Sequence, residues 1–333
     1  NSFEFTSYWA DEKNRTIPDL VDFTKTFFAK HTLLNILTRY CVFTSEDLLL
    51  VMRPYQIAAT EKILNRIIVS NNLKKTGRKE AGGYIWHTTG SGKTITSFKT
   101  AWLASRMPKV DKVVFVVDRI QLTKQTNENY KAYDPDATDD FDGIVQDTNN
   151  TTDLSRKLKS KSNGIIVTSV QKLDTLVKRK SFKSPEKNIV FIVDEAHRST
   201  AGDSFKNIQN SFKRAAWVGY TGTPTFDETT KGLRTEDIFG RPLHKYTIRE
   251  AIADRNVLGF KVDFETTIPE DVMKEKYLPS FYREKYPDWS EEKINAKIDN
   301  LTPEDMDDAV EPSFYDENPK HVELVVKDIF DKW

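Results

Sequence analysis

The stretch from Tyr84 to Thr94 constrains the fold of this chain more than any other part of its sequence. An apolar segment that ends at Trp86 is followed by a loop with two glycines and then by residues 94–105, which carry a helical pattern. This order of strand, loop and helix lets backbone N–H groups turn inward around an anion, while the helix N-terminus adds partial positive charge. The sequence therefore predicts a site for the phosphates of a nucleotide, formed by Thr89, Gly90, Ser91, Gly92, Lys93 and Thr94.

Two side chains of this loop have predicted roles, and one position departs from the usual spacing. Lys93 is expected to reach the outer phosphates, and the Thr94 hydroxyl is expected to bind Mg²⁺. His87 stands where the general pattern has a glycine. Because only positive φ values demand glycine, we expect His87 to keep ordinary β dihedrals. A simple glycine turn is the alternative, and the ending Gly92-Lys93-Thr94 argues against it.

Segments with strand and helix patterns alternate from Tyr84 onward. We expect strands at residues 84–86, 112–117, 164–168, 188–193 and 215–220, and helices at residues 94–105, 122–131, 170–177 and 204–212. The strand segments are nearly continuous runs of Val, Ile and Phe, which is typical of parallel strands that helices cover on both faces. The predicted fold class is therefore α/β, with a mostly parallel, doubly wound sheet that binds ligands at the carboxyl ends of its strands.

Two further motifs follow strands of this predicted sheet. Asp194 and Glu195 come directly after the strand at 188–193, and the tetrapeptide from Thr221 to Pro224 follows the next strand. We assign Asp194 to the hydrated Mg²⁺ of a nucleotide and Glu195 to the attacking water, from which it would accept a proton. Solvated acids at a strand end and an ordinary turn are the alternatives. The combination of both motifs with the glycine loop in one alternating series favours a nucleotide site.

The composition excludes several classes of protein. Lys plus Arg and Asp plus Glu both number 50 among the 333 residues, so a polyanionic partner would have to be bound by a local patch of positive charge. No apolar run approaches the roughly 18 residues of a membrane span, so we expect neither membrane association nor a signal peptide. The single cysteine, Cys41, excludes a disulfide framework and a thiolate zinc site; it fits a reducing cytosol and is expected to be buried.

Four motifs together resemble the first RecA-like motor domain of superfamily 2 helicases and translocases. They lie at residues 53–56, 87–94, 194–197 (a DEAH box) and 221–224. The residues at 53–58, 86–90, 115–119 and 193–199 are more similar still to the motor subunit (HsdR, the R subunit) of type I restriction endonucleases. This resemblance covers roughly residues 15–265. It implies MgATP hydrolysis coupled to translocation along double-stranded DNA, in a complex with methyltransferase and specificity subunits in the cytoplasm of a bacterium or archaeon.

The resemblance also implies roles for residues outside the phosphate loop. Gln56 would contact the adenine edge. The residues that would couple the state of the nucleotide to DNA are His197, Thr221 and Thr223. Those that would contact the DNA backbone are Arg119, Ser169 and Gln171; for Arg119 and Gln171 the alternative is a helix-end residue that satisfies local backbone groups. Lysines at 157–161 and the basic residues at 178–183 would extend this contact, although a charge run is more often a solvated face.

The two ends of the chain are expected to differ from its centre. Residues 1–50 are predicted to form a helical docking segment, residues 51–265 the RecA-like lobe, and residues 266–333 an acidic connector or insertion. A motor of this family closes its nucleotide between two such lobes, and no second phosphate-side sheet is expected after Phe264. Pro18-Asp19 is interpreted as a helix start and not as part of a nuclease site. We therefore expect the chain alone to bind nucleotide, to hydrolyse it feebly and to lack cleavage activity.

Two other functions remain open. The motifs also suit a different superfamily 2 helicase or remodeller, and copurification with a methyltransferase and a specificity subunit would distinguish the two. The chain would be a non-catalytic assembly module if the helices at 17–40 only dock partners. Equal function of a Lys93→Ala protein would favour that hypothesis. The motifs do not encode the recognised DNA sequence, the step size or the oligomeric state.

Overall fold

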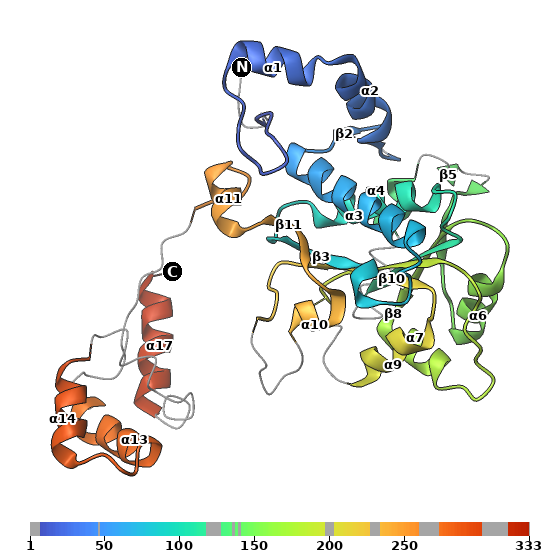
Figure 1. Cartoon of the computed structure of the whole chain (residues 1–333). Helices are drawn as coiled ribbons and strands as arrows, with labels where there is room; N and C mark the ends of the chain where they lie inside the picture. Colours follow the sequence, from blue (N-terminus) through green and yellow to red (C-terminus); the bar gives the residue numbers. More distant parts are fainter. Residues whose placement is uncertain are drawn as a thin grey trace. The chain divides into compact units, whose positions relative to one another are not determined.

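The computed structural model describes residues 7–45, 47–117, 128–134, 137–138, 141–196, 203–226, 234–259, 273–301 and 319–332. The chain divides into two compact units, Asn1–Gly259 and Phe260–Trp333, which Figure 1 colours from blue to orange and from orange to red. The three segments expected from the sequence, at 1–50, 51–265 and 266–333, stay a prediction.

A seven-stranded sheet forms the centre of the first unit (Figure 1). Its strands are, in spatial order, β11 (Pro242–Tyr246), β3 (Gly83–His87), β10 (Ala215–Thr221), β9 (Ile189–Val193), β4 (Lys112–Val117), β8 (Ile165–Ser169) and β7 (Val145–Asp147). Every pairing between neighbouring strands of this sheet is parallel. The predicted α/β class is therefore confirmed, and the carboxyl ends of these strands meet at one edge.

Helices cover both faces of the sheet. The helices on one face are α3 (Pro54–Asn72) and α4 (Lys93–Ser105), and those on the other are α6 (Thr151–Lys159), α7 (Val170–Val177), α9 (Asp203–Ser211) and α10 (Thr235–Phe239). In β4, Val113 and Phe115 pack toward α3 and α4, whereas Val114 and Val116 pack toward the opposite helices. Successive side chains of a strand point to opposite faces, so a strand covered on both faces needs apolar residues at every position.

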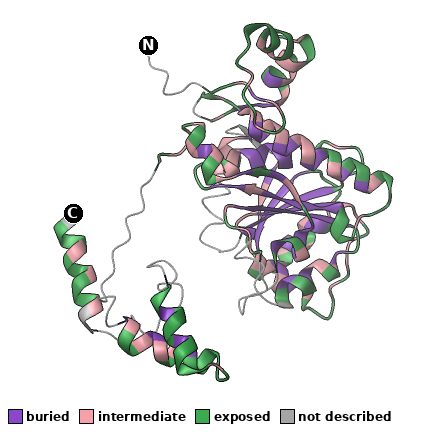
Figure 2. Ribbon diagram, turned by 60° about the vertical axis from the view of Figure 1, so that its left-hand side comes forward, coloured by how far each residue is buried: buried purple, intermediate pink, exposed green. Residues whose placement is uncertain are grey.

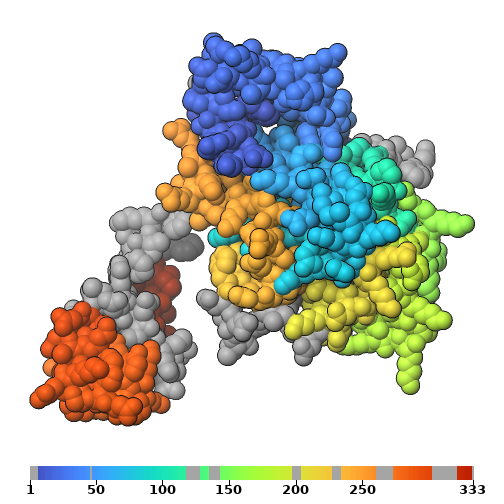
Figure 3. Space-filling model, in the orientation of Figure 1, coloured from blue at the N-terminus to red at the C-terminus, as the bar shows by residue number. Residues whose placement is uncertain are grey.

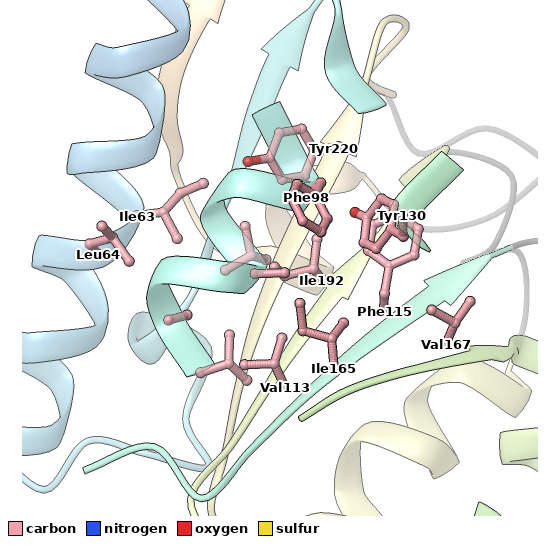
Figure 4. Close-up of a cluster of buried hydrophobic side chains, with 14 of the residues drawn as sticks. Ile63, Leu64, Phe98, Val113, Phe115, Tyr130, Ile165, Val167, Ile192 and Tyr220 are labelled. Atoms are coloured by element: carbon pink, nitrogen blue, oxygen red, sulfur yellow. The ribbon is translucent and has the colours of Figure 1, made fainter. Parts of the chain in front are cut away.

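The core under α3 and α4 contains aliphatic side chains together with two tyrosines (Figure 4). Each fully buried aliphatic or Phe side chain stabilises the fold by about 1.5–3 kcal/mol. The hydroxyl of Tyr130 donates to Ser97 Oγ at 2.9 Å, and the Tyr220 hydroxyl lies 3.0 Å from Thr100 Oγ1. Both buried hydroxyls are thus hydrogen-bonded. Figure 2 shows the buried strands in purple between helices whose outer surfaces are exposed.

Most of the expected elements of this unit are found. Residues 112–117 and 170–177 form β4 and α7 with the predicted bounds, and the strand expected at 84–86 extends over β3. Residues 128–131 of the expected helix at 122–131 are helical, and residues 122–127 lie outside the described residues. The elements without a predicted counterpart include α6, α10, β7 and β11, together with η1 (Lys79–Ala81), β5 (Ala137–Thr138), β6 (Phe141–Asp142) and α11 (Ile248–Ala253).

The N-terminal segment has the two expected helices, α1 (Leu20–Phe27) and α2 (Lys30–Arg39), followed by a hairpin of β1 (Cys41–Phe43) and β2 (Leu49–Val51). The Asp19 carboxylate accepts a hydrogen bond from Asp22 N at 2.9 Å, so it caps α1 and agrees with the expected helix start. Cys41 is buried, as predicted, and burial raises the pKa of its thiol, which makes it unreactive. Figure 3 shows this segment as the dark blue surface above the paler blue of α3.

The secondary structure described in the second unit is helical, with a short turn at 286–290. The helical elements are the π-helical turn η2 (Met273–Tyr277) and the helices α13 (Leu278–Lys285), α14 (Glu291–Asp299) and α17 (Pro319–Lys332). Leu278 and Ile294 belong to a small apolar core of this unit. Helix α17 lies within the segment expected to be an acidic connector or insertion, and residues 302–318, between α14 and α17, lie outside the described residues. Within the described ranges, no helix has the length and apolar character that are needed to cross a membrane.

Candidate nucleotide-binding site

In the loop between β3 and α4, two glycines adopt backbone conformations that other residues rarely adopt. Gly90 and Gly92 have φ values of 80° and 75°, in the left-handed region that favours glycine. A Cβ atom on Gly92 would also lie only 2.6 Å from Gln56 Nε2. His87 is the last residue of β3 and pairs with Tyr246 of β11, which confirms the β conformation expected at this position.

The carbonyl group of Thr88 is the centre of the contacts inside this loop. It accepts a hydrogen bond from Ser91 Oγ at 2.6 Å and another from Lys93 Nζ at 3.4 Å. The backbone amide of Ser91 also donates to it, at 3.3 Å. The ammonium group of Lys93 therefore points back over the loop and not away from it.

The three motifs that follow strands lie together at the carboxyl edge of the sheet. Strand β10 lies between β3 and β9, and all three run parallel. A Cβ atom on Gly222, directly after β10, would lie 3.6 Å from Lys93 Nζ. Asp194 follows β9, and its carboxyl group is close enough to Lys93 for the positive charge to lower its pKa. The common edge expected from the parallel strand order is therefore observed.

The Asp194 carboxyl group is suited to binding a cation. The residue keeps some exposed surface, but its carboxyl group is largely enclosed, and this burial raises its pKa to about 6. The negative charge of Glu195 also raises the pKa of Asp194, whereas a hydrogen bond from Glu195 N to Asp194 Oδ1, 3.0 Å long, lowers it. Because a bound cation favours the ionised form of a carboxyl group, Asp194 fits the chemistry of a Mg²⁺ ligand.

The backbone of Glu195 is in an unusual conformation. Its φ value is 44°, in the left-handed region, where a residue with a Cβ atom is strained. Such a conformation costs about 1–3 kcal/mol and persists only where the surrounding structure enforces it. Strain of this kind clusters at functional sites. It supports a functional role for the turn that presents the two carboxylates.

Aromatic side chains hold the loop from the side of α3 and β11. The rings of Tyr55 and Tyr246 are stacked, with centroids 3.7 Å apart. The Tyr55 hydroxyl donates to Ser91 O at 2.8 Å, and Thr88 N donates to Tyr246 O at 2.9 Å. These contacts fix two points of the loop. Sequence reasoning missed Tyr246 because β11 was not among the expected strands.

Gln56 contacts the loop, and a cavity lies beside it. Its Nε2 donates to Ser91 O at 3.0 Å, and its Oε1 accepts from Arg53 N at 2.8 Å. The cavity, of about 820 Å³, is lined by Gln56, the loop glycines and aromatic residues of the N-terminal segment such as Trp9 and Phe23. This volume is within the ~300–1,000 Å³ of typical small-molecule pockets. The aromatic composition of the N-terminal segment was the available signal for this lining role, which sequence reasoning missed.

The residues predicted to contact the DNA backbone are placed in part. Arg119 and the coupling residue His197 lie outside the described residues. Ser169 ends β8 and is buried; its hydroxyl accepts a hydrogen bond from Lys172 N at 3.3 Å and so caps α7. Gln171 is exposed in the first turn of α7. Ser169 therefore has a structural role at the carboxyl edge, and the DNA contacts stay predictions.

Thr221 and Thr223 share one turn after β10. Thr221 is buried and its Oγ1 accepts a hydrogen bond from Thr223 N at 3.1 Å, whereas Thr223 is exposed. This turn is next to the Lys93 ammonium group, as the position of Gly222 shows. The structure therefore brings these two residues to the phosphate loop, and their coupling role stays a prediction.

The basic segments at 157–161 and 178–183 make ion pairs and hydrogen bonds within the first unit. Lys157 forms an ion pair with Asp153 at 3.0 Å, and Lys178 forms one with Asp174 at 2.6 Å. Residues 157–159 form the end of α6, and residues 178–183 follow α7. Lys157 Nζ also donates to Asp147 O at the carboxyl end of β7, and Arg179 donates to Thr152 Oγ1 at 3.4 Å in the first turn of α6. Their contact with DNA stays a prediction.

Two buried histidines lie beside the loop. His87 Nε2 is 2.9 Å from His244 Nδ1. Burial lowers the pKa of His244 to about 4 and holds the pKa of His87 well below its ordinary value. The other ring nitrogen of His87, Nδ1, is buried without a hydrogen-bond partner in the described structure. A proton added to that nitrogen would find no acceptor, so both rings are neutral at neutral pH.

We expect this histidine pair to make the fold less stable in acid. Because both pKa values are lower in the folded chain than in the unfolded one, the unfolded chain takes up protons first as the pH falls. The contribution of the two neutral rings to the free energy of unfolding is fully present above pH 6.5 and is lost as the pH falls toward about 4. For His244 this contribution amounts to roughly 3 kcal/mol.

Denaturant unfolding between about pH 7.5 and pH 4.5 measures this loss of stability. The pH dependence should be shallower in His244→Gln, while His31→Gln, at an exposed histidine, is the control. Equal pH dependence in His244→Gln and the parent chain would contradict the expectation.

Comparisons with known proteins show to which family this sequence is similar. Residues 55–295 match the model of the SWI2/SNF2 ATPase family. Over 269 residues, which are 78% of this chain, the sequence is 40% identical to the type I restriction enzyme SsaAORF53P endonuclease subunit of Staphylococcus saprophyticus. The chain covers 27% of that relative's length.

Two further similarities differ in extent. The C-terminal part of the putative type I restriction enzyme MpnIIP endonuclease subunit, from Mycoplasma pneumoniae, is 44% identical over 211 residues, which are 61% of this chain and 99% of that relative. Among solved structures, a nuclease-deletion mutant of the Type ISP restriction-modification enzyme LlaGI in complex with a DNA substrate mimic matches with a TM-score of 0.43 and 18% identity. That match covers 84% of this chain and 29% of the LlaGI chain.

Proposed function

Because this chain belongs to the SWI2/SNF2 ATPase family and to the endonuclease subunits of type I restriction enzymes, we propose that it is the ATP-binding part of a DNA translocase. The reaction is the hydrolysis of MgATP, coupled to movement along double-stranded DNA. The observation that carries this proposal is the position of the glycine loop beside Asp194 and Glu195 at one edge of a parallel sheet. A superfamily 2 helicase of another kind is the alternative that the similarity to restriction subunits disfavours.

Each motif has a part in this reaction. Lys93 and the amides of Thr89 to Thr94 bind the phosphates, and Gln56 contacts the adenine at the edge of the aromatic cavity. Thr94 and Asp194 would hold Mg²⁺, which when bound supplies positive charge to the phosphate oxygens. Glu195 accepts a proton from the attacking water. The contact of Lys93 with the Thr88 carbonyl would be exchanged for one with a phosphate oxygen.

The remaining candidates connect this reaction to DNA. Arg119, Ser169 and Gln171 would contact the DNA backbone, which suits a motor that must move over any sequence. His197, Thr221 and Thr223 would couple the state of the nucleotide to that contact. In the whole protein we expect methyltransferase and specificity subunits as partners and a bacterial or archaeal cytoplasm as the location. DNA cleavage is proposed for the whole endonuclease subunit, since the chain spans only 27% of its relative's length.

Nucleotide assays test the proposal. The chain is expected to bind ATP in the presence of Mg²⁺ and to hydrolyse it feebly, while the whole subunit hydrolyses ATP faster when duplex DNA is added. Equilibrium binding and steady-state hydrolysis, with and without duplex DNA, measure both. Absence of Mg²⁺-dependent ATP binding would refute the nucleotide site. Robust DNA-stimulated turnover by the chain alone would refute the need for a second lobe.

A further inference from the structure

The amino edge of the sheet, opposite the phosphate loop, has a basic pocket. A cavity of about 630 Å³ lies between α3, the turn η1 and the start of β11. Its lining contains five cationic side chains, Lys62, Arg66, Lys75, Lys79 and Arg241, and two carboxylates, Glu80 and Glu236. The chain as a whole has equal numbers of basic and acidic residues, so this excess of positive charge is a local feature.

Most of these cations are not neutralised by neighbouring carboxylates. Lys79 reaches Asp237 at 3.9 Å, which is a long contact. Arg66 donates one hydrogen bond to the backbone carbonyl of Glu80, at 3.2 Å. Within the ranges that the structure describes, Lys62, Lys75 and Arg241 take part in no ion pair. Their charges are available to an anionic ligand.

The wall of the pocket is held firmly by close backbone contacts. The amide of Gly77 donates to Ala215 O at 2.8 Å. A Cβ atom on Gly77 would lie 2.0 Å from the Lys213 carbonyl oxygen, and one on Gly82 would lie 1.8 Å from the Trp217 carbonyl oxygen. The segment that carries Lys75 and Lys79 is therefore fastened to β10 and the residues before it, so part of the cationic arrangement exists before any ligand binds.

Positive charge also continues beyond the pocket. Arg78 precedes β3 and Lys213 precedes β10, both are exposed, and neither has an ion-pair partner in the described part of the chain. Since β11, β3 and β10 are neighbours in the sheet, about 4.8 Å apart, the segments that lead into them bring basic residues to the same edge of the sheet. Several cations spread along one edge suit an extended polyanion better than a single small ion.

We propose that this basic pocket binds phosphate groups and that the backbone of duplex DNA supplies them. Lys and Arg side chains bind phosphodiester oxygens without reading the sequence, which is what the pocket's composition provides. The pocket is at the opposite edge of the sheet from Lys93. It therefore makes a second contact with DNA that is independent of nucleotide hydrolysis.

Charge removal inside the pocket tests the proposal. Lys62→Gln combined with Arg241→Gln removes two cations that have no ion pair to lose, and Lys25→Gln combined with Lys30→Gln makes the same change of charge at exposed sites. Fluorescence anisotropy with a labelled duplex at several salt concentrations gives the affinity and its salt dependence. The pocket variant should bind the duplex about 10-fold more weakly, and the slope of log affinity against log salt should decrease in magnitude by nearly 2. The control variant should bind as the parent chain does.

A second arm distinguishes DNA from a small polyphosphate. Tripolyphosphate is titrated calorimetrically into Lys93→Ala, in which the phosphate loop is disabled, and into the same protein with the pocket substitutions. Tripolyphosphate binding that the pocket substitutions abolish, with duplex affinity unchanged, would overturn the assignment to DNA. Unchanged duplex affinity together with no tripolyphosphate binding would overturn the pocket itself.

Two measurements keep the test independent of folding and of the proposed ATPase function. MgATP affinity should be the same in the pocket variant and the parent chain, which shows that the phosphate loop is intact. If the first variant does not fold, Lys75→Gln combined with Lys213→Gln changes two exposed side chains and is expected to give the same loss of duplex affinity. A loss of duplex affinity in a protein that binds no nucleotide would support the pocket while refuting the ATPase proposal.

Discussion

Replacement of Lys93 by alanine is expected to lower kcat/KM for ATP hydrolysis by at least about 100-fold, because in the proposed reaction it removes the cation that would face the phosphates in the transition state. The Lys93 ammonium lies 3.4 Å from the Thr88 carbonyl, inside the phosphate loop. Its charge also lowers the pKa of Asp194, which burial has raised to about 6. The substitution therefore removes phosphate binding and at the same time makes Asp194 harder to ionise, which weakens Mg²⁺ binding. Steady-state hydrolysis by the whole subunit and MgATP binding by the chain measure the two effects.

A matched control for this substitution is Lys25→Ala, at an exposed lysine of α1. It removes the same side chain from a site that takes no part in the proposed reaction, so hydrolysis should be unchanged. Thermal unfolding of Lys93→Ala should resemble that of the parent chain, since Lys93 is partly exposed and its contact with Thr88 is long. Hydrolysis within about threefold of the parent in Lys93→Ala would contradict the proposed site and favour an assembly role.

The strands that helices cover on both faces were predictable from the sequence. So was the position of the glycine loop and Asp194 at the same edge of the sheet. Strand β4 has the expected bounds because each of its positions from Val113 to Val117 is buried in one core or the other. Parallel strands deliver their carboxyl ends to one edge, so Lys93 and Asp194 could be placed together without coordinates. The runs of apolar residues in the sequence were therefore enough to predict parallel strands and their common carboxyl edge.

Elements at the edges of the sheet were missed for physical reasons. In β11 the buried residues His244 and Tyr246 flank the exposed Lys245, and an irregularity in the pairing between Pro242 and His244 breaks the register. A short, half-buried edge strand that begins with proline has too few apolar residues to be recognised. The Tyr55–Tyr246 stack depends on that strand, so it could not be foreseen either.

Helix α6 carried a signal that could have been used. The Asn150 side chain caps it by accepting hydrogen bonds from Thr152 N at 3.0 Å and Asp153 N at 2.9 Å. Leu154 and Leu158, its buried residues, have the spacing of one helical face. Asn at a helix start is a recognised cap. The basic pocket had no such signal, because its cations come from separate segments that only the fold brings together.

We expect Glu195→Gln to separate nucleotide binding from hydrolysis. Glutamine has the shape of glutamate but does not accept a proton from water at neutral pH, so hydrolysis should fall by roughly 10²–10⁴-fold. Glutamine adopts the strained backbone at φ 44° no less readily than glutamate does, so the turn that presents Asp194 should be preserved. MgATP affinity should then stay within about threefold of the parent value. Single-turnover hydrolysis and equilibrium binding on the same protein measure the two quantities.

Asp194→Asn is the matched comparison, because it makes the same chemical change at the neighbouring residue. Its effect should appear in Mg²⁺-dependent nucleotide binding. Burial raises the pKa of Asp194 and the Lys93 charge lowers it, so a nearby positive charge already favours the ionised form of this carboxyl group. Equal loss of MgATP binding in Glu195→Gln and Asp194→Asn would show that both carboxylates act on the metal. Undiminished hydrolysis in Glu195→Gln would instead mean that the strained turn serves only to position Asp194, and that another group activates the water.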